Sequence, residues 1–333
     1  MADALILAQA LADPTSLALD TDWTGLVTLA RAERLLGTLA SRLDGLPLPE
    51  DVALLLAEAR AAAENDRRAA LWEAEMARRA LAPLGGPIVL LKGTAFAAAG
   101  LAAGQGRSIG DLDVLVPCEA LDAVEAALLA AGWEWAKPDP YDDAYYRRWM
   151  HELPPLIHRE RDRMIDVHHT ILPLTARITP DAEALLAAAM PLGNGLSVLS
   201  PADMLCHAAA HLFADGDLAG GLRNLWDIHC LLGEFGSDGL EARAAHHGLS
   251  QAVARALRLA HRLYATPVAE PYRQIRGMDA LYLRRLLARD DWGRPTRPLT
   301  RLVFYVRSHW LRMPPAMLAR HLWTKWRKRR GSS

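Results

Sequence analysis

The sequence is poor in cysteine, and the three cysteines that it has are widely spaced. Cys118, Cys206 and Cys230 form no CxxC pair and no disulfide framework. Disulfides persist mainly in oxidising compartments, so this usage predicts a protein of a reducing compartment.

Long hydrophobic runs are also lacking. No uncharged apolar stretch approaches the ~18 residues that a membrane-spanning helix needs. The first residues, MADALILAQALADPTS, have no basic region and contain acidic side chains, which argues against a secretory signal. We therefore expect a soluble, cytoplasmic protein.

The chain has almost no net charge, because 38 Lys and Arg residues balance 39 Asp and Glu residues. This balance makes a long nucleic acid an unexpected partner, although it does not exclude tRNA ends. Residues 310–330 are the exception, since they combine tryptophans with basic residues at roughly helical spacing. Such a segment can lie on a membrane or on nucleic acid, or contact an acidic partner, and a solvated tail explains the same pattern.

Phenylalanine is scarce, whereas alanine and leucine are abundant, and this composition favours helices. Residues 1–84 show helical periodicity up to the Gly-Gly-Pro at 85–87, and we expect packing helices there. From about 176 the pattern is helical again, with Ser200 and Pro201 giving a clear helix start. Two or three compact units fit a chain of 333 residues, and the pattern divides it at 1–84, 85–175 and 176–333.

The middle unit, residues 85–175, has a different pattern. Short apolar runs at 87–93 and 111–117 predict buried strands with a small helix between them, and an amphipathic helix follows. After a long stretch that looks irregular, residues 155–171 predict a hairpin around a charged turn. Strand, helix, strand, helix and hairpin describe a small α/β unit within an α+β protein.

Two carboxylates, Asp111 and Asp113, alternate along the strand DLDVLVP and therefore share one face. Two such charges repel each other at that distance, and a divalent cation would relieve the repulsion. Asp166 is a third acid within an apolar strand, IDVHH, and would join them if the two strands are neighbours. The alternative is ordinary: Asp111 caps a turn and Asp113 faces solvent.

The chain resembles the bacterial uncharacterised nucleotidyltransferase family, within the superfamily that shares its fold with DNA polymerase β. The resemblance rests on a Leu-Lys-Gly turn at 91–93, on Arg107 before DLDVLV, on Gly132-Trp133, and on IDVHH. It covers roughly residues 85–235. It implies a small mixed sheet with helices, flanked by N-terminal helices and a C-terminal helical bundle.

The resemblance also implies a metal site. Asp111, Asp113 and Asp166 would be the catalytic acids and would hold Mg²⁺, with two ions expected and Mn²⁺ as an alternative. Asp111 and Asp113 would hold the ion that bridges the nucleotide phosphates. Asp166 would complete the second metal site and help to activate an acceptor hydroxyl.

Nucleotide-binding residues follow from the same resemblance. Gly93 would let the backbone approach the triphosphate, with Lys92 and Thr94 on either side of it. Lys92 replaces a residue of the usual Gly-Ser pair, and it would either contact a phosphate or point away. Arg107 is a further phosphate ligand or a solvated loop residue, and His168 either contacts phosphate or packs in the core.

The predicted function is transfer of a nucleoside monophosphate from an NTP, ATP by default, to a hydroxyl-type acceptor with release of pyrophosphate. Two alternatives stay open. A non-catalytic module on the same fold would bind a nucleotide or partner without turnover, and Lys92 is the reason to consider it. The same site could instead transfer a phosphoryl group. The acceptor is not identified.

Arg223 and Asp227, four residues apart on a predicted helix, have two interpretations. They form a structural ion pair along the helix, or one of them reaches into the cleft between the middle unit and the helical one.

Overall fold

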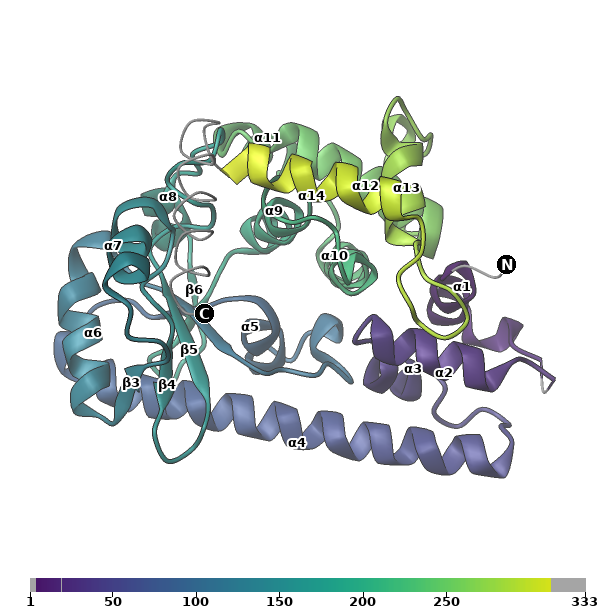
Figure 1. The fold of residues 1–333 in the computed structure, drawn as a ribbon, viewed down its shortest axis with the longest axis horizontal. Coiled ribbons are helices and arrows are strands. Elements are labelled where there is room, and N and C mark those ends of the chain that lie inside the picture. The colour runs from purple at the N-terminus through teal and green to yellow at the C-terminus, as the bar shows by residue number, and fades with distance from the viewer. Residues whose placement is uncertain (1–3, 19, 313–333) are drawn as a thin grey trace, which may run out of the picture.

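The computed structural model describes residues 4–18 and 20–312, and Figure 1 shows a mixed sheet between helical regions. The first helices are α1 Leu5–Ala12, α2 Trp23–Ala32, α3 Leu36–Arg42 and α4 Glu50–Leu81. Asp22 caps α2 by accepting a hydrogen bond from the Gly25 N–H. The 32 residues of α4 run below the molecule in Figure 1, from the N-terminal helices to α6 beside the sheet.

The sheet has seven strands in the order β3-β4-β5-β2-β1-β7-β6. Their bounds are β1 Val89–Leu90, β2 Leu112–Leu115, β3 Trp133–Trp135, β4 Leu156–His158, β5 Met164–His168, β6 Met190–Pro191 and β7 Ser197–Val198. Between them lie α5 Lys92–Ala98, α6 Leu121–Ala130 and α7 Pro140–Trp149. Mixed strands with separate helical regions make the protein α+β, as the sequence predicted.

The pairing of β2 with β5 decides where the acids lie. The two strands are parallel and adjacent, and Asp113 is paired with Asp166 in their register. On its other side, β2 pairs with β1 in the antiparallel direction. All four residues of β2 are buried, so this strand is central to the sheet. The prediction that the two acid-bearing strands are neighbours is confirmed.

Two regions differ from the sequence prediction. The stretch after residue 132 was expected to be irregular, but it contains β3 and α7. Trp133 is buried on the edge strand, and Asp139 accepts a hydrogen bond from the Tyr141 N–H in the first turn of α7. These local signals outweigh the prolines and charges that made the stretch look like a loop.

The second difference lies after residue 176, where only helices were expected. Strand β7 pairs in parallel with β1, and β6 completes a small hairpin at the sheet edge. Each strand is two residues long, too short for a periodic pattern to reveal. The sheet therefore extends past residue 175, while the division of the chain into three units stays a prediction.

The later helices are α8 Ala182–Ala187, α9 Pro201–Ala210, α10 Gly221–Phe235, α11 Leu240–His246, α12 Ser250–Tyr264, α13 Asp279–Leu286 and α14 Pro298–Arg312. The helix start predicted at Ser200 is confirmed, since its side chain accepts a hydrogen bond from the Asp203 N–H at 3.3 Å. The basic segment 313–333 lies outside the described residues. None of the helices within the described residues is long and apolar enough to cross a membrane.

One continuous buried cluster joins the N-terminal helices, the sheet and the later helices. Helix α1 packs against α12, so the beginning of the chain contacts its last third. This shared core includes α10, which packs against the short 3-10 turn Ala102–Gly104 that follows α5. The site described next depends on that arrangement.

Candidate active site

Three carboxylates meet at the amino-terminal ends of β2 and β5. Asp111 directly precedes β2, Asp113 lies within it, and Asp166 lies beside Asp113 in β5. One oxygen atom from each lies within 4.8 Å of the others. Asp111 is exposed, Asp113 is buried and Asp166 is half-buried, so the cluster leads from solvent into the sheet.

Asp113 is held as a carboxylate by two donors. Its Oδ1 accepts hydrogen bonds from Lys92 Nζ at 2.6 Å and from His168 Nε2 at 2.9 Å. Burial alone would raise the pKa of Asp113, but the charge of Lys92 and the bond from His168 hold it well below its usual range. Burial lowers the pKa of Lys92, but the charge and hydrogen bond of Asp113, together with nearby acids, raise it by more. The Lys92 pKa therefore lies above its usual value, and both members of the pair are ionised.

Asp166 behaves in the opposite way. Burial, the neighbouring Asp113 charge and the nearby Glu152 raise the pKa of Asp166 to about 7. A carboxyl group with that pKa exchanges a proton near neutral pH, whereas an isolated aspartate does not. The cluster therefore contains one firmly ionised acid and one that can take up a proton.

The three carboxylates suit a hard divalent cation. Carboxylate oxygens are the preferred ligands of Mg²⁺, and the neighbouring charge of Asp113 adds to burial in opposing the ionisation of Asp166. Lys92 offsets the charge of one acid only, so a cation would favour the ionised form of the cluster. The donor set fits magnesium or manganese.

A cleft of about 720 Å³ lies beside the acids, and Asp111, Asp113, Lys92 and Gly93 form one side of it. This volume lies within the range of ~300–1,000 Å³ typical of small-molecule sites. Four arginines from distant parts of the chain form the basic part of the lining: Arg34, Arg107, Arg223 and Arg289. The cleft thus brings together acids that suit a cation and arginines that suit phosphate groups.

The arginines are fixed by acidic partners outside the cleft. Asp227 forms ion pairs with Arg107 and with Arg223, and Arg289 Nε lies 2.8 Å from Glu33. Arg223 is buried, and burial lowers its pKa to about 10, although Asp227 works against that shift. Its Nε–H has no hydrogen-bond partner among the described residues. Both interpretations of Arg223 and Asp227 hold: the two residues pair along α10, and Arg223 also lines the cleft.

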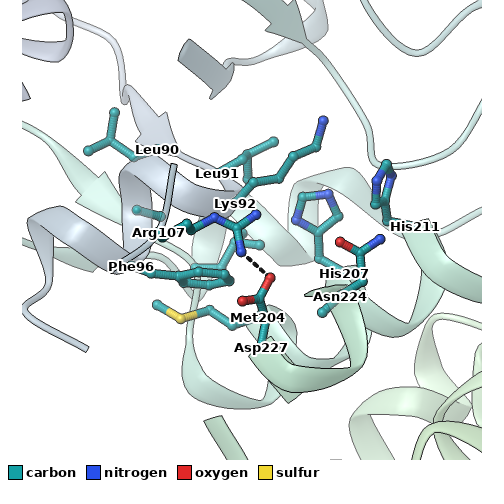
Figure 2. Close-up of a pocket in the computed structure, with 13 residues that line it drawn as sticks. Leu90, Leu91, Lys92, Phe96, Arg107, Met204, His207, His211, Asn224 and Asp227 are labelled. Atoms are coloured by element: carbon teal, nitrogen blue, oxygen red, sulfur yellow. Dashed lines mark hydrogen bonds and ion pairs between the residues drawn. The ribbon is translucent and has the colours of Figure 1, made fainter. Parts of the chain in front are cut away.

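The Arg107 side chain packs against α5 at Gly93, where the absence of a side chain leaves room for it. A Cβ atom on Gly93 would lie 2.6 Å from Arg107 Nε and 3.3 Å from Ile109 Cγ1. The guanidinium then lies over the Phe96 ring and points to Asp227, as Figure 2 shows. Helix α5 has seven residues, and Lys92 at its start has a positive φ of 49°, a conformation uncommon outside glycine.

Thr94 does not line the cleft. Its side chain is buried, and its hydroxyl has no hydrogen-bond partner among the residues described. His168 is also buried and touches the site only through Asp113 and Glu152. Of the predicted nucleotide-binding residues, the structure brings Lys92, Gly93 and Arg107 to the cleft and sets Thr94 and His168 behind it.

A second, smaller cavity adjoins the cleft behind Lys92 (Figure 2). It has a volume of about 50 Å³ and is lined by apolar residues together with Lys92, Arg107, His207, His211, Asn224 and Asp227. Burial holds the pKa of His207 well below its usual value, so its imidazole is neutral. The cavity has room for one or two water molecules and not for a nucleotide base.

Three contributors were not predicted from sequence. Glu152 pairs with His168 through an isolated bridge, and its carboxylate lies 3.5 Å from His168 Nε2. Arg34 and Arg289 reach the cleft from α2's end and from the loop after α13. No local motif indicates these three residues, because they lie outside the acidic motifs in the sequence and approach the site only in the folded chain.

The chain belongs to the uncharacterised nucleotidyltransferase family. The family model matches residues 20–265, which include the acidic cluster, the whole sheet and α10. No curated protein matches this chain. Arg289 lies beyond the matched residues, so this cleft residue is a feature of the chain outside the family match.

Proposed function

We propose that the protein transfers a nucleoside monophosphate from an NTP to a hydroxyl-type acceptor and releases pyrophosphate. The observation that carries the proposal is the parallel register of β2 and β5. It joins Asp111, Asp113 and Asp166 beside a cleft that is also lined by four arginines. Membership of a nucleotidyltransferase family supports the same reaction class.

In the proposed reaction, the acceptor oxygen attacks the α-phosphorus as its bond to the β-phosphate oxygen breaks. A new phosphodiester bond forms, and pyrophosphate leaves. Asp166 would accept the proton of the acceptor hydroxyl, because it supplies the third carboxylate of the cluster, beside Asp113. Asp111 and Asp113 would hold Mg²⁺, which neutralises charge on the phosphates.

The basic side of the cleft would bind the β- and γ-phosphates. Arg107 and Arg223 are held in place by Asp227, so little side-chain entropy is lost when an anion arrives. A phosphate oxygen could also accept the unpaired Nε–H of the buried Arg223. Catalysis would then consist mainly of positioning and charge neutralisation.

The proposal is tested with each of the four α-labelled NTPs, Mg²⁺ and candidate acceptors, with labelled product and pyrophosphate as readouts. Calorimetry measures NTP binding with and without Mg²⁺. Asp113→Asn should abolish Mg²⁺-dependent binding, while Asp122→Asn, an exposed acid on α6, should not change it. The proposal is wrong if NTP binding does not depend on Mg²⁺ and Asp113→Asn behaves like the wild type.

A second function is favoured by one observation, the ion pair between Lys92 and Asp113. A lysine paired with a metal-binding acid could keep the site in a form that binds a nucleotide without turnover. Release of pyrophosphate would exclude this binding module. Phosphorus NMR separates the remaining alternative, because phosphoryl transfer from ATP yields ADP instead of pyrophosphate.

A further inference from the structure

Helix α14, Pro298–Arg312, presents an apolar face to solvent. Its inward face is formed by the buried residues Thr300, Phe304 and Ser308, which contact α13 and the turn at 211–215. Its outward face is aliphatic, and its side chains are 53–78% exposed: Leu299, Leu302, Val303 and Val306.

These four outward residues form one stripe, because their spacing of three and four follows the helical repeat. Trp310 continues the stripe and is about half exposed. A surface helix of a globular protein normally turns its apolar stripe to the core and its polar residues to water. Helix α14 does the reverse over ~22 Å of length.

Charge in the same part of the chain is of one sign. From Trp292 onward the sequence contains no aspartate or glutamate. It contains eleven of the 38 basic residues: Arg294, Arg297, Arg301, Arg307, Arg312, Arg320, Lys325, Arg327, Lys328, Arg329 and Arg330. The rest of the chain therefore carries 27 basic residues against all 39 acidic ones. Such asymmetry is typical of a segment that meets an anionic surface.

Three aromatic side chains in this part of the chain are also exposed. Trp292 before α14 and Tyr305 and Trp310 within it are 63%, 52% and 49% exposed, respectively. Tryptophan and tyrosine favour the boundary between water and lipid, where an apolar ring and a polar tip are both satisfied. An aliphatic stripe with exposed aromatic and basic side chains nearby is typical of helices that lie in a membrane interface.

We propose that α14 docks the protein on an anionic lipid surface. The stripe supplies apolar contact, and the excess of basic over acidic residues from Trp292 onward supplies attraction to lipid headgroups, the two contributions that stable attachment needs. A nucleic acid would use the charge but leave Leu302 and Val306 exposed. A second copy of the chain would cover the stripe but bring a second set of like charges beside the first.

The orientation of α14 is fixed by the bundle. Arg307 donates a hydrogen bond to the Phe213 carbonyl and lies over the Tyr282 ring. Phe304 packs edge to face on the same ring, with centroids 4.9 Å apart. These contacts hold the helix by its inward face, so the aliphatic stripe is available without any rearrangement of the fold.

The test is co-sedimentation of the full chain with vesicles of two compositions: phosphatidylcholine alone, and equal parts of phosphatidylcholine and phosphatidylglycerol. We expect binding to the second and little to the first, weakened by added NaCl. Two variants separate the contributions. Leu302→Glu with Val306→Glu removes the stripe, and Gln at positions 327–330 removes four basic residues. Each should lower the partition coefficient by about tenfold or more.

Leu54→Glu on α4 is the matched control, since Leu54 is 63% exposed on a distant helix, and it should bind vesicles like the wild type. Circular dichroism confirms that the variants fold. Absence of binding to anionic vesicles overturns the proposal, and so does unchanged binding by the stripe variant. Sedimentation that shows a dimer dissociated by the stripe variant, without vesicle binding, assigns the stripe to a second copy instead.

Discussion

Lys92 and Asp113 form an ion pair inside the acidic cluster, with Nζ 2.6 Å from Oδ1. Lys92 extends from the start of α5 with a positive φ, and Asp113 lies at 3% exposure in the central strand β2. The lysine therefore stands where a cation is expected, and it neutralises part of the charge that a metal ion would neutralise.

Replacing Lys92 by methionine should show whether the lysine neutralises charge that a metal ion would otherwise neutralise. Without metal, Lys92→Met leaves Asp113 as a buried charge with one donor fewer, and loss of one partner of a buried pair costs about 3–5 kcal/mol. We expect a lower Tm in EDTA, a larger increase in Tm on adding Mg²⁺ than in the wild type, and weaker NTP binding. Thermal unfolding and calorimetry measure all three.

Lys137→Met provides the control for Lys92, because Lys137 is exposed and lies outside the cleft. It should leave Tm and the response to Mg²⁺ unchanged. If Lys92→Met responds to Mg²⁺ no more than the wild type does, the lysine does not share the position of a metal ion.

Asp166 predicts a pH dependence of stability. Its pKa rises from 3.8 in the unfolded chain to about 7 in the folded protein. The group therefore contributes stability that is fully present below 3.8 and is lost as the pH rises through about 7. Asp166→Asn should raise Tm at pH 8 in EDTA by a few degrees, because each pKa unit corresponds to about 1.4 kcal/mol.

The same substitution should abolish the increase in Tm that Mg²⁺ produces in the wild type, because an amide carries no charge for the ion. Asp122→Asn controls for the general effect of removing an acid. A lower Tm for Asp166→Asn in EDTA at pH 8 would contradict the assignment, because the carboxylate would then be a stabilising group.

The acidic cluster could be predicted from sequence because it depends on local rules. Alternation along a strand places Asp111 and Asp113 on one face, and an apolar strand containing Asp166 is a natural neighbour. Periodicity does not show which strands are neighbours. The family resemblance predicted that the strands of Asp113 and Asp166 lie side by side. Short edge strands such as β6 and β7 could not be predicted, since two residues carry no period.

The basic side of the cleft was harder to predict because it is built from contacts between distant residues. Arg289 is fixed by Glu33, 256 positions earlier in the chain. Arg223 was recognised as one half of an ion pair, but its place in the cleft depends on how α10 packs against the turn Ala102–Gly104. Helix α14 shows a further limit of periodicity. Its apolar residues have ordinary helical spacing, but in the structure their side chains are exposed to solvent.

Asp227 gives a prediction about the basic side. It is the acidic partner of both Arg107 and Arg223, and Arg223 is buried. Asp227→Asn leaves two guanidinium groups without a countercharge, so we expect a loss of about 3–5 kcal/mol in the free energy of unfolding. Pyrophosphate should restore more stability to this variant than to the wild type, because it replaces the lost charge. Chemical denaturation with and without pyrophosphate measures both effects, and equal stabilisation of the two proteins would place the anion elsewhere.

The last prediction concerns Gly93, where substitution by alanine should displace the Arg107 side chain. In Gly93→Ala the new Cβ would lie 2.6 Å from Arg107 Nε, so the Arg107 side chain must shift from its position over Phe96 and beside Asp227. We expect NTP affinity to fall by about tenfold while Mg²⁺ binding at the three acids persists, since Arg107 does not contact them. Gly86→Ala is the matched control, because a Cβ there meets no atom within 4 Å. If Gly93→Ala weakens NTP and Mg²⁺ binding to the same degree, the glycine is needed by the acidic side of the cleft and not by Arg107.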